Sequence, residues 1–269
     1  MRLLPRIGRL ALLALPLASL ACDEHKYDGI LAEAAAPVPS AAITPIVAPP
    51  PAPTAPAFKK RSASDCKPHP ATVDFGDDAA LEAEVRKKLG KDGGAIAPSD
   101  LAQIKSINLA TAKVHQIDPC IFPMFTILKD LFLGPGEYDD LTPLQKLTTL
   151  ESLRLSYSQV KDLHAIEGLK RMDRLDLSHT LIGDDELKSV GSLVNVTELM
   201  LDEDNVTDLS PVSNMKKLEK LSIKKTGVKS LAPLAQIKTL KILYIADTPI
   251  SDITPVQPLV SGGLKIMHQ

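Results

Sequence analysis

The chain has 269 residues and a formal net charge of −2; 44% of its residues are hydrophobic but only 3% are aromatic. Nucleic-acid binding requires a basic surface, so this slightly acidic chain predicts no nucleic-acid partner. The length and the apolar content suffice for a folded core, although not every segment contributes to one.

The first 21 residues have the features of a signal peptide. Three arginines precede an apolar run from Leu10 to Leu20, which is shorter than the roughly 20 residues of a membrane-spanning helix. Residues 18–22 (ASLAC) resemble a bacterial lipobox, in which the cysteine is lipidated and becomes the mature N-terminus. We therefore expect Cys22 to carry a lipid such as palmitate and to attach the protein to a membrane. The alternative is a secreted protein in which Cys22 has no such role.

Residues 22–61 predict a lipidated N-terminus followed by a tether. Eight of the twenty residues from Pro37 to Pro56 are proline, which favours extended polyproline II conformations over a fold. We interpret this stretch as a spacer that holds the folded domain clear of the membrane. The alternative is a docking motif in the prolines of residues 49–53, or contact with the cell wall. The basic run 59–61 is expected to be solvated at the domain boundary.

A helix is predicted over residues 79–89. Asp77 or Asp78 can cap its start, acidic residues precede basic residues along it, and Gly90 stands where a left-handed stop is favourable. Leu81, Val85 and Leu89 form an apolar stripe on one face of this helix.

A shorter helix is predicted with Ser99 as its N-cap, running towards Ile104. Together the two helices form an N-terminal cap over residues 62–103. Such a cap is required because a terminal repeat otherwise exposes apolar core and an unpaired strand edge.

One apolar pattern repeats from residue 104 to residue 269, at intervals of 22 or 24 residues. In the repeat 150–171 the apolar residues stand at positions 1, 4, 6, 11, 14, 17 and 20. A period of this length headed by L-x-x-L-x-L is typical of leucine-rich repeats. One such repeat cannot bury its apolar side alone, so the pattern predicts a stacked solenoid.

The segments 75–90 and 96–109 resemble the opening of bacterial internalin-like leucine-rich-repeat domains, which place the same cap helix and short second helix before the repeats. The likeness extends from Phe75 to about Leu259. It implies an α/β solenoid with a curved parallel sheet on the concave side and 3-10 turns or short helices on the convex side. It also implies binding of proteins or surface polysaccharides. The immunoglobulin-like module of many internalins has no counterpart in these residues.

Two cysteines remain once Cys22 is assigned to lipid. In an exported protein Cys66 and Cys120 are expected to form a disulfide, which would close a loop of 54 residues. The alternative is a free thiol at Cys66 and a small apolar core residue at Cys120.

Motifs for catalysis and metal binding are missing from the sequence. It has no phosphate-binding loop, nucleophile elbow or H-E-x-x-H pattern, and its six histidines occupy unrelated repeat positions. The acidic run 184–186 resembles a cation site, but acids are also expected there as the first residues of a helix. We therefore expect no catalytic residue, no metal and no cofactor.

Repeat positions 3, 5, 7 and 8 are expected to project from the concave sheet, because they alternate with or follow the buried positions 4 and 6. The large apolar groups among them are the stronger binding candidates. The charged residues form an acidic row beside a lysine row, which either pair with each other or face a ligand. The small polar residues at position 9 are expected to bond the turn backbone. The candidate binding face comprises Phe132, Arg154, Tyr157, Arg174, Asp176, Glu198, Met200, Asp202, Lys220, Lys224 and Tyr244.

These features predict a monomeric, envelope-anchored lipoprotein without catalytic activity. Its domain would lie in the periplasm or outside the cell, attached to the inner or the outer membrane. Its concave face would bind an unknown protein or surface polysaccharide. The alternative is a structural component that assembles through the last strand edge, where the stub 264–267 follows no obvious capping helix.

Overall fold

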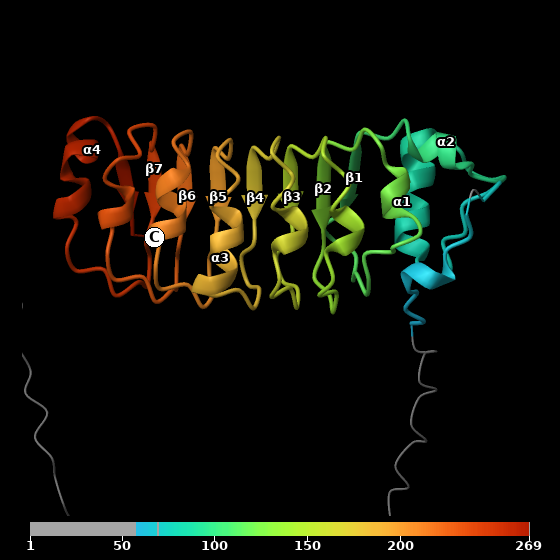
Figure 1. The fold of residues 1–269 in the computed structure, drawn as a ribbon, viewed down its shortest axis with the longest axis horizontal. Coiled ribbons are helices and arrows are strands. Elements are labelled where there is room, and N and C mark those ends of the chain that lie inside the picture. Colours follow the sequence, from blue (N-terminus) through green and yellow to red (C-terminus); the bar gives the residue numbers. More distant parts are fainter. Residues whose placement is uncertain (1–57, 69, 269) are drawn as a thin grey trace, which may run out of the picture. The chain divides into compact units, whose positions relative to one another are not determined.

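The computed structural model describes residues 58–68 and 70–268. The predicted signal peptide, Cys22 and the proline-rich tether lie outside these residues. Within them, eight parallel strands follow one another in chain order in a single sheet (Figure 1). The strands are β1 (Ser106–Leu109), β2 (Asp130–Leu133), β3 (Ser152–Arg154), β4 (Arg174–Asp176), β5 (Glu198–Met200), β6 (Lys220–Ser222), β7 (Ile242–Tyr244) and β8 (Lys265–Met267).

Short helical turns line one side of this sheet, in front of the strands in Figure 1. The arrangement confirms the predicted α/β leucine-rich-repeat solenoid. The α-helices are α1 (Ala79–Leu89), α2 (Pro98–Leu101), α3 (Asp184–Val190) and α4 (Gln257–Ser261). The 3-10 turns are Ala63–Asp65, Phe122–Met124, Thr142–Leu144, His164–Ile166, Ser210–Asn214, Ala232–Leu234 and Thr254–Val256.

The apolar period explains both the core and the register. All seven apolar positions of the repeat 150–171 are less than 2% exposed, and the same holds for the repeats that begin at Met172, Val196 and Leu218. Equivalent residues are paired across neighbouring strands, so Leu131, Leu153 and Leu175 lie in one row. The 24-residue repeat that begins at Met172 keeps this register because its extra residues lie in α3, where other repeats have a 3-10 turn.

The N-terminal cap closes the first edge of the sheet. As predicted, Asp78 caps α1 by accepting a hydrogen bond from the Leu81 amide at 2.9 Å, and Gly90 ends the helix in the left-handed region. The Glu84 carboxylate accepts a hydrogen bond from the Asn108 amide of β1 at 3.2 Å, so an edge N–H is satisfied by the cap.

The expected N-cap of the second helix was wrong by two residues. Helix α2 begins at Pro98, with Ala97 rather than Ser99 at the N-cap position. Proline suits the first turn because its ring fixes φ and it has no amide hydrogen to leave unpaired. The Asp100 carboxylate accepts a hydrogen bond from the Ala97 amide at 2.9 Å, and this bond caps the start of the helix.

The other end of the sheet is formed by β8, a strand of three residues. Helix α4 precedes it and directly continues the last 3-10 turn, so a helix does form where none was obvious from the sequence. The outer edge of β8 has no strand partner among the described residues. Assembly through this edge stays a prediction. None of the described helices is long and apolar enough to span a membrane.

Candidate binding surface

The outward face of the sheet carries the predicted binding residues. Along β2, Leu131 and Leu133 are buried in the core, while Asp130 and Phe132 project to the other side and are half-buried. Tyr157 is 55% exposed and is the most exposed aromatic side chain of this set. Because equivalent residues pair across neighbouring strands, these candidates form one continuous surface from β2 to β7.

The C-terminal half of this surface is occupied by internal charge pairs. Lys224 Nζ lies 3.1 Å from Asp202 Oδ2, and Lys220 Nζ lies 3.9 Å from Glu198 Oε2. Both lysine Nζ atoms also lie about 6 Å from the centre of the Tyr244 ring, within reach of a cation–π contact. Of the two interpretations left open by the sequence, the structure favours mutual pairing of the acidic and lysine rows.

The N-terminal half of the surface is hollowed. A depression of about 340 Å³ lies over β2 to β5, with Ser152 at its base. Its apolar lining includes Phe132 and Met200, and its charged lining residues are Arg154, Arg174, Asp176 and Glu198. Arg154 is held by Asp176, whose carboxylate lies 3.1 Å from the arginine Nε, whereas the side chain of Arg174 has no hydrogen-bond or ion-pair partner within residues 58–68 and 70–268.

A second depression of about 320 Å³ adjoins the first and shares Arg154 with it. It lies between Pro135 and Tyr157 at the strand ends. Gly134 is needed in its lining because the backbone of the preceding repeat approaches closely: a Cβ there would lie 2.1 Å from the Ala112 carbonyl oxygen and 2.5 Å from that of Leu109.

A row of left-handed residues, which we call the strand-end ridge, borders the surface where the strands end. Its members have φ between 54° and 61° although none is glycine, a conformation that costs roughly 1–2 kcal/mol per residue. The side chains of its first four members contact each other. The rings of Tyr157 and His179 stack 4.0 Å apart, His179 Nδ1 lies 3.2 Å from Glu203 Oε2, and Glu203 forms an ion pair of 2.5 Å with Lys225. The ridge comprises Tyr157, His179, Glu203, Lys225 and Asp247.

Beneath the ridge lies the row of position-9 residues. Thr226 and Thr248 donate their hydroxyl hydrogens to backbone carbonyls three residues earlier, each at 2.7 Å, as the sequence predicted. Asp204 differs from them. Its Oδ1 accepts hydrogen bonds from the Thr180 amide at 2.8 Å and hydroxyl at 3.0 Å, while its Oδ2 is buried with no partner among the described residues.

Burial raises the pKa of Asp204 to about 7, and the nearby carboxylates of Asp176 and Asp202 act in the same direction. A group with this pKa changes charge near neutral pH, which the sequence did not reveal. The signal available was an aspartate at a position that holds serine or threonine in the neighbouring repeats.

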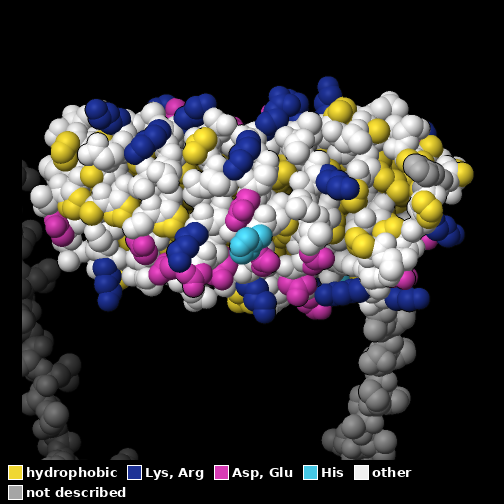
Figure 2. Space-filling model, in the orientation of Figure 1, with side chains coloured by type: hydrophobic (Ala, Val, Ile, Leu, Met, Phe, Trp, Pro, Cys, Tyr) yellow, Lys and Arg dark blue, Asp and Glu magenta, His cyan; other side chains and the backbone are white. Residues whose placement is uncertain are grey.

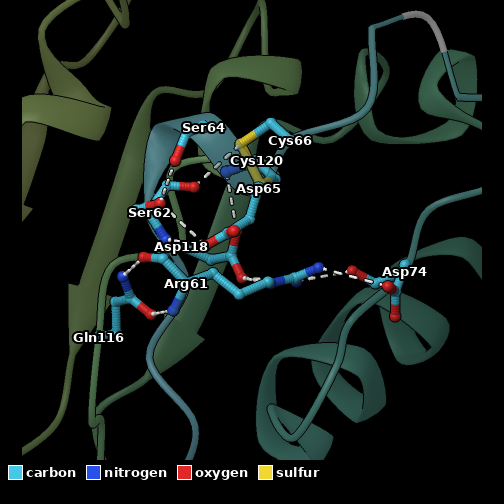
Figure 3. The surroundings of a disulfide bond; sticks show 9 residues. All are labelled: Arg61, Ser62, Ser64, Asp65, Cys66, Asp74, Gln116, Asp118 and Cys120. Atoms are coloured by element: carbon cyan, nitrogen blue, oxygen red, sulfur yellow. Dashed lines mark hydrogen bonds and ion pairs between the residues drawn. A yellow bond between two sulfur atoms is a disulfide. The ribbon is translucent and has the colours of Figure 1, made fainter.

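The cap is tied to the first repeat by a disulfide and by Arg61 (Figure 3). Cys66 and Cys120 are bonded, with sulfur atoms 2.09 Å apart. Arg61 Nε donates to Asp118 Oδ2 at 2.8 Å, and Arg61 also exchanges backbone hydrogen bonds with the Gln116 side chain. The expectation that the basic run 59–61 is solvated was therefore wrong for Arg61, whose side chain is only 18% exposed.

On the side of the helical turns, basic side chains line the upper edge, and acidic side chains gather along the lower edge with basic ones among them (Figure 2). Several of the acidic residues cap 3-10 turns. In each case the carboxylate accepts a hydrogen bond from the backbone amide two residues later in the chain; these residues are Asp140, Asp162, Asp208 and Asp252. The run 184–186 opens α3 as predicted. Among the described residues, no group of three His, Cys, Asp or Glu side chains could hold a metal ion.

Comparison with known proteins agrees with this architecture. No sequence-family model matches the chain, and no curated protein is significantly similar to it. Two solved internalins of Listeria monocytogenes, inlF and inlC2, are 28% and 29% identical to it, with TM-scores of 0.64 and 0.63. Each alignment covers 71% of this chain, but 55% of inlF and 92% of inlC2.

A leucine-rich-repeat protein of Leptospira interrogans has a TM-score of 0.53 at 21% identity, over 64% of this chain and 51% of that protein. This likeness shows the fold alone. The chain thus spans about half the length of inlF and of the Leptospira protein. The described domain has an internalin-like leucine-rich-repeat fold.

Proposed function

We propose that this chain is a lipid-anchored protein of a bacterial cell envelope whose leucine-rich repeats bind a partner protein through the outward face of the sheet. The observation that carries the proposal is the pair of adjoining hollows over β2 to β5. The helical turns all pack on the other side of the sheet, so this face is available to a partner. Large side chains beside depressions on an exposed surface are typical of binding sites.

The mode of action in this proposal is recognition without catalysis. The acidic side chains near the hollows are engaged in ion pairs, and the Ser156 hydroxyl in the second hollow accepts a hydrogen bond from Arg154 Nε at 2.9 Å. A partner would therefore be held by apolar contact and charge complementarity. The partner, rather than this chain, would carry any chemical activity.

The proposed anchor predicts that Cys22→Ala releases the protein from membranes, because acyl chains on that cysteine are its expected attachment. The fractions of protein in the membrane pellet and the soluble supernatant measure this. Replacement of Ser40, in the tether, by alanine is the control and should leave the protein in the pellet. Continued membrane association of Cys22→Ala would refute the lipid anchor.

The proposed binding face predicts that a photo-crosslinking amino acid at Tyr157 captures a partner protein in intact cells. Tyr157 is 55% exposed beside the second hollow. Val194 provides a matched control, because it is 49% exposed but lies in the turn that leads into β5, outside the hollows. We expect a defined crosslinked band from position 157 and none from position 194. Equal labelling from both positions, or none from 157, would argue against the sheet face.

A further inference from the structure

The guanidinium of Arg174 stands apart from the other cations on the sheet face. Arg154, Lys220 and Lys224 each lie within 4 Å of a carboxylate, whereas Arg174 is exposed and has no such neighbour within the described residues. The nearest acid by register, Glu198, instead points to Lys220 on the following strand. Asp176 and Glu198 also line the first hollow, but they pair with Arg154 and Lys220. Arg174 is therefore the charged lining residue that has no ion-pair partner among the described residues.

Apolar side chains also line the same hollow. The side chains of Phe132 and Met200 wall it, and Leu153 and Leu175 contribute to its lining. Ser152 leaves room at the base because its side chain is small and is only 3% exposed. A volume of about 340 Å³ accommodates one large aliphatic or aromatic side chain with its flanking backbone.

We infer that the partner bound by the sheet face presents an extended acidic segment, in which one large apolar side chain fills this hollow and an adjacent carboxylate pairs with Arg174. This inference rests on the proposed function and specifies the chemistry of its partner. An arginine can hold a carboxylate through two parallel hydrogen bonds, which gives both affinity and orientation. The apolar hollow beside it selects a peptide segment over a polysaccharide, because sugar hydroxyls would lose their hydrogen bonds there.

The test is selection of a random linear octapeptide library, displayed on phage, against the immobilised intact chain. We expect enriched peptides to contain a large apolar residue next to aspartate or glutamate. A synthetic peptide of the enriched sequence should bind Arg174→Gln at least tenfold more weakly than the unchanged chain. Arg171→Gln is the matched control, since Arg171 is exposed in the same turn of chain but precedes β4 and does not line the hollow.

Filling the hollow provides an independent check. Ser152→Leu should abolish peptide binding, and Met200→Ser, at the wall, should weaken it if the leucine variant does not fold. Enriched peptides without acidic residues, affinity unchanged in Arg174→Gln, or no enrichment at all would overturn the inference. Binding of heparin, an anionic polysaccharide, with the same dependence on Arg174 and Ser152 but without peptide enrichment would overturn it as well.

The two proposals fail in different ways. If the partner crosslinked from position 157 is still captured by Arg174→Gln and Ser152→Leu, the sheet face binds a protein but the inferred acidic segment is wrong. If the peptide selection succeeds while no partner is crosslinked in cells, the chemistry of the hollow is supported and the cellular role fails.

Discussion

Replacing Asp204 with asparagine is expected to remove a large part of the pH dependence of stability. Relative to the unchanged chain, the free energy of unfolding of Asp204→Asn should rise by about 3 kcal/mol between pH 4.5 and pH 8. The reason is that asparagine keeps the shape and the acceptor oxygen for Thr180 but carries no buried charge. Urea unfolding at a series of pH values measures the effect.

The direction follows from the two protonation equilibria. Burial raises the pKa of Asp204 to about 7 in the folded protein, from an ordinary value of 3.8. Between these two pH values the folded state holds a proton that the unfolded state has released. The free energy of unfolding therefore falls as the pH rises, and the loss is complete above about pH 7. The unpartnered Oδ2 is the structural source of this cost, because nothing replaces the water that it loses.

Asp247→Asn is the control for this experiment. Asp247 lies on the strand-end ridge and is exposed, so its replacement removes a carboxylate from the surface and not from the interior, and should not reproduce the effect of Asp204→Asn. A parallel pH profile for Asp204→Asn and the unchanged chain would show that Asp204 is ionised in the folded protein at low pH, and would refute the prediction.

Removal of the disulfide is expected to destabilise the domain by about 4 kcal/mol, the chain-entropy value for a 54-residue loop. The loop between Cys66 and Cys120 contains α1, α2 and β1, so the bond holds the cap against the end of the sheet. The double variant Cys66→Ser with Cys120→Ser should unfold at a clearly lower urea concentration than the unchanged chain under non-reducing conditions.

Addition of a reductant provides the matching test in the unchanged chain. It should shift the unfolding midpoint of that chain to the value of the double variant, and leave the double variant where it was. Cys22→Ser is the control, because it removes a cysteine outside the loop and should not move the midpoint. Insensitivity of the unchanged chain to reductant would contradict a bonded Cys66 and Cys120.

The apolar period was sufficient to predict the solenoid because burial is a local property of each repeat position. Leucine at positions 4 and 6 must face the core wherever the repeats stack, so the outward positions follow by alternation. The cap helix was predictable for a similar reason: Asp78 and Gly90 are chemical signals that act within a few residues of themselves.

The state of the candidate surface was not predictable in the same way. Lys224 and Arg174 both occupy outward positions, but the structure pairs Lys224 with Asp202 and leaves Arg174 without a carboxylate partner among the described residues. Whether an outward charge finds a partner depends on which side-chain rotamers fit beside neighbours from other repeats. Arg61 was misjudged for the same reason, since its partner Asp118 lies 57 residues away.

The strand-end ridge and Asp204 show this limit most clearly. Left-handed conformations usually select glycine or asparagine, yet the ridge contains tyrosine, histidine and lysine, because contacts between neighbouring repeats hold the backbone there. The sequence by itself determined the repeat, the buried positions and the outward face, since these depend on periodicity. Only the tertiary structure decided which outward charges are paired, where the face is hollow and which carboxyl is buried, because those depend on side chains brought together from different repeats.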